Sequence, residues 1–242
     1  MLDRVGEAPG FRAPDVQGDV LDALVDAPAY NHWLFERALP HLGASVLDAG
    51  AGIGTFTELA LEAGHRVTAL EPDPLFAERL ESRFGDRDGF SLARAELGAG
   101  DIPTGFDSAL CLNVLEHVPD DRAALLTLRD ALRPGGRLLL LVPAHPFLFG
   151  AADDTLGHER RYRRAELERL VRECGFAVVE SRSVNPVGAL GWLVSSRLLR
   201  RSTVPRSPLR LYDRLVPVLR VVDRLRLPFG LSVWLVAQKP GG

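Results

Sequence analysis

The chain has 242 residues, of which 46% are apolar and 25% charged, and its formal net charge is −3. This length allows one α/β domain, or one domain with an elaborated cap, with a full core, and the net charge argues against a protein whose whole surface binds nucleic acid. Two cysteines, Cys111 and Cys174, make no disulfide framework, and no apolar secretory segment is visible near the N-terminus. We therefore expect a cytoplasmic protein, in which apolar runs such as Leu138 to Val142 are too short to cross a bilayer.

Strand and helix patterns alternate along the chain, as they do in a parallel sheet with helical crossovers. A short helix is expected around residues 30–35, ahead of the first strand. Strands are predicted at 45–49, 66–70, 90–94, 107–112, 137–142, 176–183 and 232–238. Helices that end at glycine or proline signals are predicted at 55–63, 75–84, 120–132 and 163–174. This order predicts one doubly wound α/β domain over residues 1–242.

The first two strands carry the clearest motif of the chain. The motif has two parts. The end of the first strand and the turn after it supply Asp48, Ala49, Gly50, Gly52 and Gly54, and the end of the second strand supplies Glu71 and Pro72. Glycines in such a turn let a ligand approach the backbone and the N-terminus of the next helix. A carboxylate at the end of the second strand is placed to accept both hydroxyls of a ribose. The motif predicts a ligand that contains a nucleoside.

The spacing of the glycines decides between nucleoside ligands. In the dinucleotide fingerprint read from Gly50, the third glycine would fall at Thr55. Asp48 stands two residues before Gly50, where it would repel a pyrophosphate but could neutralise an ammonium group. The segment therefore resembles motif I of the class I S-adenosylmethionine-dependent methyltransferases. That resemblance implies S-adenosylmethionine as cofactor and a seven-stranded Rossmann-like sheet whose last strand is antiparallel.

Two later segments are similar to parts of the same family. Residues 107–118 resemble the fourth strand of the family and the turn after it. Residues 132–142 resemble the loop and the strand that follow in the family. The resemblance implies that Asn113 faces the methionine part of the cofactor, although a turn-former is the alternative there. His117 is either a wall of the site or a packing residue. Ala95 and Glu96 fall where the family contacts adenine, and Asp101 is the rival of Glu96 for the adenine amino group.

The residues before the first strand resemble a family lid. Small-molecule methyltransferases similar to this chain have a Tyr-Asn-x-Trp pattern, seen here from Tyr30 to Trp33, in helices that cover the cofactor. Tyr30 is expected to contact the cofactor or to pack in the core. The resulting subdivision is a lid at 1–44, a cofactor-binding core at 45–185 and 231–240, and an insertion at 186–230.

The segment after the fifth strand holds the candidate catalytic residues. It resembles an Asp-x-x-Leu-Gly-His-x-Arg-Arg-Tyr signature in one branch of the family, and its candidates are His145, His158, Arg161 and Tyr162. An imidazole could remove the acceptor's proton, and Arg160 or Arg161 could hold an anionic group. The alternative is a structural network in which Asp153 pairs with an arginine and His158 caps the helix that starts near Arg163.

No metal site is expected, because no cluster of His and Cys has ligand spacing and the adjacent Asp153 and Asp154 alone do not make one. Nucleic acid is not an expected partner either. The turn after the fourth strand lacks the Asn/Asp-Pro-Pro-aromatic sequence of amino-methylating DNA enzymes.

The insertion at 187–230 is strongly basic, since it holds nine arginines against Asp213 and Asp223, a net charge of +7 that leaves −10 for the rest of the chain. Its apolar residues recur at helical spacing as Leu211, Leu215, Val218, Val222 and Leu225, and Pro217 is expected to kink or divide the helix. Three roles stay open: a cap over a hydrophobic substrate, a homodimer interface, or a peripheral contact with an anionic membrane.

The sequence thus predicts an enzyme that moves the methyl group of S-adenosylmethionine to an O, N or C nucleophile of a small molecule, such as a specialised metabolite. A lipid-linked acceptor, a module that binds the cofactor without catalysis, and a nicotinamide-linked oxidoreductase are the competing hypotheses, and the glycine spacing disfavours the last.

Overall fold

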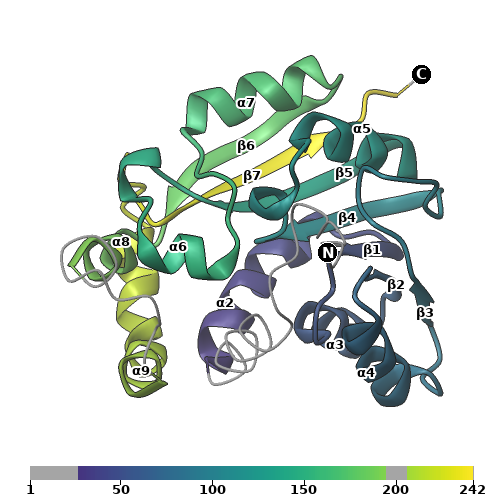
Figure 1. Cartoon of the computed structure of the whole chain (residues 1–242), viewed down its shortest axis with the longest axis horizontal. Helices are drawn as coiled ribbons and strands as arrows, with labels where there is room; N and C mark the ends of the chain where they lie inside the picture. Colours follow the sequence, from purple (N-terminus) through teal and green to yellow (C-terminus); the bar gives the residue numbers. More distant parts are fainter. Residues whose placement is uncertain (1–26, 195–205, 242) are drawn as a thin grey trace, which may run out of the picture.

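The computed structural model describes residues 27–194 and 206–241 and is built around one seven-stranded sheet (Figure 1). The strand order is β3-β2-β1-β4-β5-β7-β6. The strands are β1 (Ser45–Ala49), β2 (Arg66–Leu70), β3 (Phe90–Ala93), β4 (Phe106–Leu112), β5 (Leu132–Pro143), β6 (Ala177–Val184) and β7 (Ser232–Gln238).

The sheet has the expected mixed topology. Strands β1 to β5 pair in parallel, whereas β7 lies antiparallel between β5 and β6. The predicted Rossmann-like sheet with an antiparallel last strand is therefore confirmed. The strand order reverses between β1 and β4, and in open α/β sheets ligands bind outside the carboxyl ends of the strands at such a point.

Helices cover both faces of the sheet because successive strand residues point to opposite sides. Leu47, Ala109 and Leu140 pack in one core cluster with α5 and α7, while Val46, Leu110 and Leu141 pack in another with α2, α3 and α4 (Figure 1). The α-helices are α2 (Pro28–Ala38), α3 (Thr55–Glu62), α4 (Pro74–Phe84), α5 (Asp121–Ala131), α6 (Ala151–Leu156), α7 (Arg164–Glu173), α8 (Pro186–Trp192) and α9 (Arg206–Asp223). The 3₁₀ turns are η1 (Leu39–His41), η2 (Leu115–His117) and η3 (Pro146–Leu148).

Strand β5 is longer than the sequence pattern predicts. It begins at Leu132, which pairs with Phe106, and its register shifts before Arg137 pairs with Ser108. The Pro-Gly-Gly segment between these two pairs is an irregularity inside the strand and does not interrupt β5.

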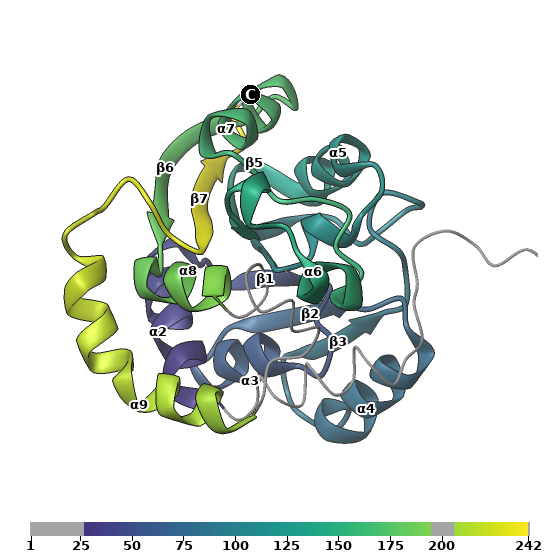
Figure 2. The ribbon, with the colours of Figure 1, turned by 60° about the vertical axis from the view of Figure 1, so that its left-hand side comes forward.

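The insertion contributes α8 and α9, and α9 lies against α2 (Figure 2). Val216 and Leu219 of α9 pack on Trp33 of α2. Asp223 is buried and accepts hydrogen bonds from Arg37 of α2 and Arg182 of β6. The insertion is therefore fixed to the body by one apolar contact and one buried ion network.

The apolar stripe recognised in the sequence is largely exposed and is not the side of α9 that packs on the body. Leu215, Val218 and Leu225 are 44%, 59% and 69% exposed, whereas the residues that face α2 are Val216 and Leu219. Leu211 lies where side chains are not described. The pairing of Asp223 with arginines from two other elements sets the rotation of the helix, which apolar spacing alone could not reveal. Pro217 lies inside α9 and does not divide it.

Candidate functional site

The glycine turn after β1 has a backbone that other residues adopt only with strain. Gly50, Gly52 and Gly54 have φ values of 72°, 55° and 86°. A Cβ at Gly50 would lie 2.6 Å from the Val114 side chain, and a Cβ at Gly54 would lie 2.5 Å from Phe84. The turn leads directly into α3, so its amides and the N-terminus of α3 face the carboxyl edge of the sheet. The turn therefore fits a ligand that needs close backbone approach.

Glu71 closes this turn from the end of β2. Its Oε2 accepts from the Gly52 amide at 2.7 Å and its Oε1 from the Asp73 amide at 3.0 Å. Burial raises the pKa of Glu71, and the two backbone hydrogen bonds oppose that rise. A carboxylate offers about four acceptor positions, so two remain for a pair of ribose hydroxyls. Pro72 follows Glu71 and is half-buried.

Asp48 is buried at the end of β1, with Ala49 after it, and its Oδ2 accepts from the Thr57 hydroxyl at 2.6 Å. Burial raises the pKa of Asp48 to about 6, and hydrogen bonds from Thr57 moderate the rise. The carboxylate therefore ties the first turn of α3 to β1, in addition to its expected interaction with an ammonium group.

Ala95 and Glu96 follow β3, the neighbour of β2. The Glu71 amide donates to Ala93 at the end of β3, so this loop leaves the sheet beside Glu71. Ala95 is half-buried, and Glu96 and Asp101 are both exposed. Asp101 lies further along the path to the amino end of β4, which begins at Phe106.

Asn113 and Tyr30 border the same edge of the sheet. Asn113 has a φ of 56° directly after β4, and its amide donates to Leu141 of β5 at 2.8 Å. Tyr30 packs edge-on against Trp33. Burial raises the pKa of the Tyr30 hydroxyl to about 12, and a hydrogen bond with Asn185 partly offsets this rise. Tyr30 thus links α2 to the carboxyl end of β6.

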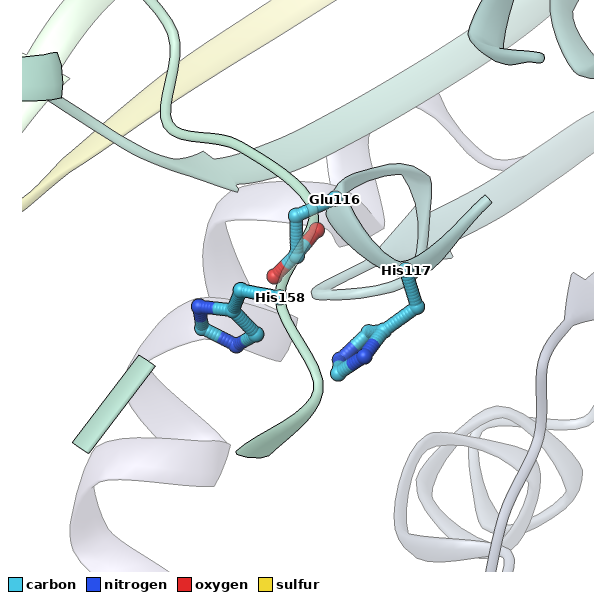
Figure 3. A group of neighbouring side chains, drawn as sticks. All are labelled: Glu116, His117 and His158. Carbon is cyan, nitrogen blue, oxygen red and sulfur yellow. The ribbon is translucent and has the colours of Figure 1, made fainter. Parts of the chain in front are cut away.

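Glu116, His117 and His158 converge at the same edge (Figure 3). Glu116 and His117 lie in η2, three residues beyond Asn113, and His158 lies in the loop after α6. One potential ligand atom from each of the three side chains lies within 4.8 Å of the others. Burial, together with the charge of His158, lowers the pKa of His117 to about 4, so His117 is neutral at pH 7. The spacing of residues in the sequence did not reveal this cluster, because His158 is far from Glu116 and His117 along the chain and comes close to them only in the folded protein.

Asp153 orients the histidine of this cluster. Its Oδ1 pairs with His158 Nδ1 at 2.8 Å and accepts from Arg161 Nε at 2.8 Å. Burial alone would raise the pKa of Asp153, but His158 and Arg161 outweigh it and hold that pKa below its usual value. The alternative in which Asp153 pairs with an arginine is confirmed. His158 does not cap α7, which begins at Arg164 without a side-chain cap.

The two arginines of the signature are engaged within the protein. Arg161 also donates to the Ala144 carbonyl, and its guanidinium lies over the Trp192 ring of α8 at 4.7 Å. Arg160 donates to the carbonyls of Val118 and Pro119, at 2.8 Å each. Neither guanidinium therefore presents the open fork expected for a bound anion.

Tyr162 and His145 occupy different surroundings from His158. The Tyr162 hydroxyl is buried and lies 3.1 Å from Asp121 of α5 and 3.3 Å from the Leu115 carbonyl. Burial raises the pKa of Tyr162. His145 stacks on Phe229 at 4.7 Å with a φ of 60°, and its pKa is lowered by burial and by Arg161. Both residues are therefore engaged in contacts within the protein that do not involve His158.

Sequence reasoning missed Glu116 as a member of the site. Glu116 is 1% exposed, and its Oε2 has no hydrogen-bond partner among the described residues. A signal was present, since Glu116 stands between Asn113 and His117 in a segment already assigned to the site. Within residues 27–194 and 206–241, none of the helices combines the length and the apolar character needed to cross a membrane.

Comparisons with known proteins agree with this geometry. Residues 26–181 match the family described as Methyltransferase domain. The chain is 26% identical over 195 residues to a ubiquinone biosynthesis O-methyltransferase of Aeromonas salmonicida, covering 74% of this chain and 82% of that protein. It is 33% identical over 127 residues to a tRNA U34 carboxymethyltransferase of Chromohalobacter salexigens, covering 48% of this chain and 38% of that protein.

A solved structure shows the same fold. The chain superimposes on a 1,6-didemethyltoxoflavin-N1-methyltransferase of Burkholderia thailandensis, which holds 1,6-didemethyltoxoflavin and S-adenosylhomocysteine, with a TM-score of 0.57. The two are 24% identical, and the match covers 97% of this chain and 93% of the other. The family match spans more than half of the chain, and the glycine turn and Glu71 fit the cofactor of that family. The chain belongs to the methyltransferase-domain family and is a class I S-adenosylmethionine-dependent methyltransferase.

Proposed function

We propose that this enzyme transfers the methyl group of S-adenosylmethionine to a hydroxyl oxygen of a small molecule that lies beside Glu116, His117 and His158. The observation that carries the proposal is the Asp153–His158 pair, held at the carboxyl edge of the sheet next to the glycine turn. A hydroxyl must lose its proton on methylation, and an imidazole oriented by a carboxylate is a group suited to promote that loss. The name of the Aeromonas relative, an O-methyltransferase, supports oxygen as the acceptor atom.

The cofactor end of the proposed site comprises the turn and the strand ends around it. Its residues are Tyr30, Asp48, Ala49, Gly50, Gly52, Gly54, Glu71, Pro72, Ala95, Glu96, Asn113 and His117. Glu71 would accept from the ribose hydroxyls, because both of its oxygens are already fixed by backbone amides. We favour Glu96 over Asp101 at the adenine, since Glu96 stays closer to the end of β3 and therefore to Glu71.

The acceptor end supplies orientation and proton removal. Bound S-adenosylmethionine supplies a methyl group already activated by its sulfonium. The acceptor oxygen forms a bond to that methyl as the carbon–sulfur bond breaks, and the electron pair of the broken bond returns to sulfur. The chain's task is to align the oxygen and to favour its ionised form. His158 does this from a position that Asp153 fixes. Arg161 fixes Asp153, and Tyr162 and His145 hold the segment that carries them.

A lipid-linked or membrane-surface acceptor is the second proposal. Its support is the exposed side of α9, which carries Val218, Val221 and Arg214, and the turn directly after it, which exposes Arg224 and Leu225. Such a face suits an anionic interface. In contrast, the tRNA-modifying relative matches over 38% of its own length, which gives little support for a nucleic-acid acceptor.

The proposal is tested by incubating the enzyme with methyl-labelled S-adenosylmethionine and a panel of hydroxylated, amino and carbon-acid small molecules. We expect label in hydroxylated compounds and a dependence of turnover on His158. Label only in amines or carbon acids would contradict the assignment to oxygen. Cofactor binding without label in any acceptor, including lipid extracts, would instead indicate a binding module.

A further inference from the structure

The cluster in Figure 3 has the donor set of a cation site. It offers one carboxylate and two imidazoles, a combination that binds divalent transition metals. Two donors come from the single turn η2 and the third from the loop after α6, so the three side chains approach one point from different sides.

The free atoms of the three side chains are the ones that a cation needs. His158 Nδ1 faces Asp153, and His117 Nδ1 lies 3.3 Å from the Gly157 carbonyl. Because both Nδ1 atoms face oxygen acceptors, each neutral ring carries its proton there and keeps a lone pair on Nε2. A carboxylate or carbonyl behind a histidine in this way orients metal-binding imidazoles in general.

Glu116 is the independent sign of a missing partner. Its side chain is almost completely buried, and its Oε2 lacks a hydrogen bond within the described residues. A buried polar atom without a partner destabilises a fold by roughly 1–3 kcal/mol, and more if it is charged. The nearby Arg161 does not neutralise Glu116 fully, because its Nε is paired with Asp153.

We infer that Glu116 Oε2, His117 Nε2 and His158 Nε2 bind one divalent transition-metal cation, for which Zn²⁺ is a suitable probe. Zinc takes nitrogen and oxygen ligands at about 2.0–2.2 Å, so neighbouring ligand atoms lie roughly 3.3 Å apart in a tetrahedral site. One potential ligand atom from each of the three side chains already lies within 4.8 Å of the others, so binding would require these atoms to move closer together. Three protein ligands leave one position open, as in catalytic zinc sites.

The site lies where the proposed acceptor does, and its role in turnover rests on the proposed function. A cation at the open position would favour the ionised form of an acceptor hydroxyl, in the way that metals lower the pKa of bound water. His158 would then act as a ligand, and the proton of the acceptor hydroxyl would pass to water and not to His158. Binding of the cation does not depend on the identity of the acceptor, and it can be measured without one.

The test uses the full chain without an affinity tag, stripped with a chelator and returned to chelator-free buffer. Zn²⁺ is titrated by calorimetry, and Co²⁺ binding is followed by visible absorption, which reports nitrogen and oxygen ligation directly. We expect one Zn²⁺ per chain, and a loss of affinity of at least about tenfold in Glu116→Gln and in His117→Ala. His32→Ala, which removes an exposed histidine of α2, is the matched control and keeps the wild-type affinity.

Circular dichroism shows whether each variant is folded. The inference is overturned if the wild-type chain does not bind Zn²⁺ one to one. It is also overturned if wild type, Glu116→Gln and His117→Ala bind Zn²⁺ with equal affinity. If Glu116→Gln does not fold, His117→Ala decides alone. Methyl transfer that proceeds in the metal-free enzyme, with no Zn²⁺ bound on titration, would remove the cation and leave the proposed function standing. If zinc binds at Glu116 but the enzyme methylates no acceptor, the cation site stands and the proposed function fails.

Discussion

The amide of Gly52 donates to the Glu71 carboxylate at 2.7 Å, across 19 residues of sequence. This hydrogen bond joins the turn after β1 to the end of β2, so the two halves of the cofactor motif form one rigid unit. The acidic residue is thereby held before a ligand arrives, and binding does not need to order it.

Replacement of Glu71 by alanine should weaken S-adenosylmethionine binding by roughly 100-fold, since hydrogen bonds to charged groups contribute about 1.5–3 kcal/mol each. Calorimetric titration measures this loss, and circular dichroism checks the fold. The control is Glu78→Ala, which removes an exposed carboxylate of α4 and should leave affinity unchanged. Gly50→Arg should likewise abolish binding, because of its positive φ and the nearby Val114. Wild-type affinity in both site variants would refute the assignment.

His158→Ala should keep the affinity for S-adenosylhomocysteine and lower kcat by roughly 10²–10⁴-fold. The reason is that His158 stands at the acceptor end, away from the ribose contacts of Glu71. Single-turnover assays with an acceptor from the panel give the measurement. His65→Ala, on a histidine bonded to the Gly43 carbonyl at the opposite edge of the sheet, serves as the control. A variant that loses stability and cofactor affinity together would favour a purely structural role.

Asp48→Asn should stabilise the unliganded protein at pH 8 while weakening cofactor binding. The folded-state pKa of Asp48 is about 6, above its ordinary value of 3.8, because the carboxylate is buried. The ionised form is therefore disfavoured in the fold, and stability present below pH 3.8 is lost as pH rises through about 6. The gain in the variant is at most about 3 kcal/mol at pH 8 and should vanish near pH 4.

Urea unfolding at several pH values measures this gain. Asp86→Asn, on an exposed carboxylate, provides the reference and should show no such trend. An Asp48→Asn protein that is less stable than wild type at pH 8 would mean that the hydrogen bonds from Thr57 outweigh the burial of the charge.

Asp223→Asn should detach the insertion from the body of the protein. The carboxylate is 3% exposed and pairs with Arg37 and Arg182, so its loss leaves two guanidinium groups without their counter-charge. We expect a destabilisation of about 3 kcal/mol and faster proteolysis within 186–230. Glu58→Gln, which breaks an exposed pair with Arg83, should cost less than about 1 kcal/mol. Equal effects of the two substitutions would contradict the account of how α9 is held.

Contact with an anionic membrane should depend on the exposed side of α9. The protein is expected to sediment with vesicles of anionic lipid at low salt and to be released at high salt. Val221→Asp should reduce sedimentation, whereas Val179→Asp, on an equally exposed residue of β6, should not. Failure of the wild-type protein to sediment at low salt would exclude the membrane proposal.

The sheet could be predicted closely from the sequence. Strands β1, β2 and β7 have the predicted bounds, because each is a buried apolar run between clear turn signals. Strand β5 was mispredicted at its start, since pairing of Leu132 with Phe106 overrides the local Pro-Gly-Gly signal. Local sequence specifies these elements wherever no distant partner competes.

The acceptor end and the insertion depended on distant partners. Glu116 is a candidate for the site only because folding brings His158 beside it, and the buried face of α9 is fixed by the pairing of Asp223 with Arg37 and Arg182. Helical periodicity identifies apolar sides of a helix but cannot show which of two such sides is buried. In α9 the pairing of the buried Asp223 determines which side faces the body. Charge pairs between remote segments are the information that a single sequence did not supply.

We propose that the turn from Gly50 to Gly54 and the Glu71 carboxylate bind S-adenosylmethionine. Parallel calorimetric titrations with S-adenosylmethionine, S-adenosylhomocysteine and NAD measure this binding. We predict saturable one-to-one binding of the first two, loss of both in Glu71→Ala, and no binding of NAD. Binding of NAD in place of the two S-adenosyl compounds, or affinity for them that is unchanged in Glu71→Ala, would contradict the account.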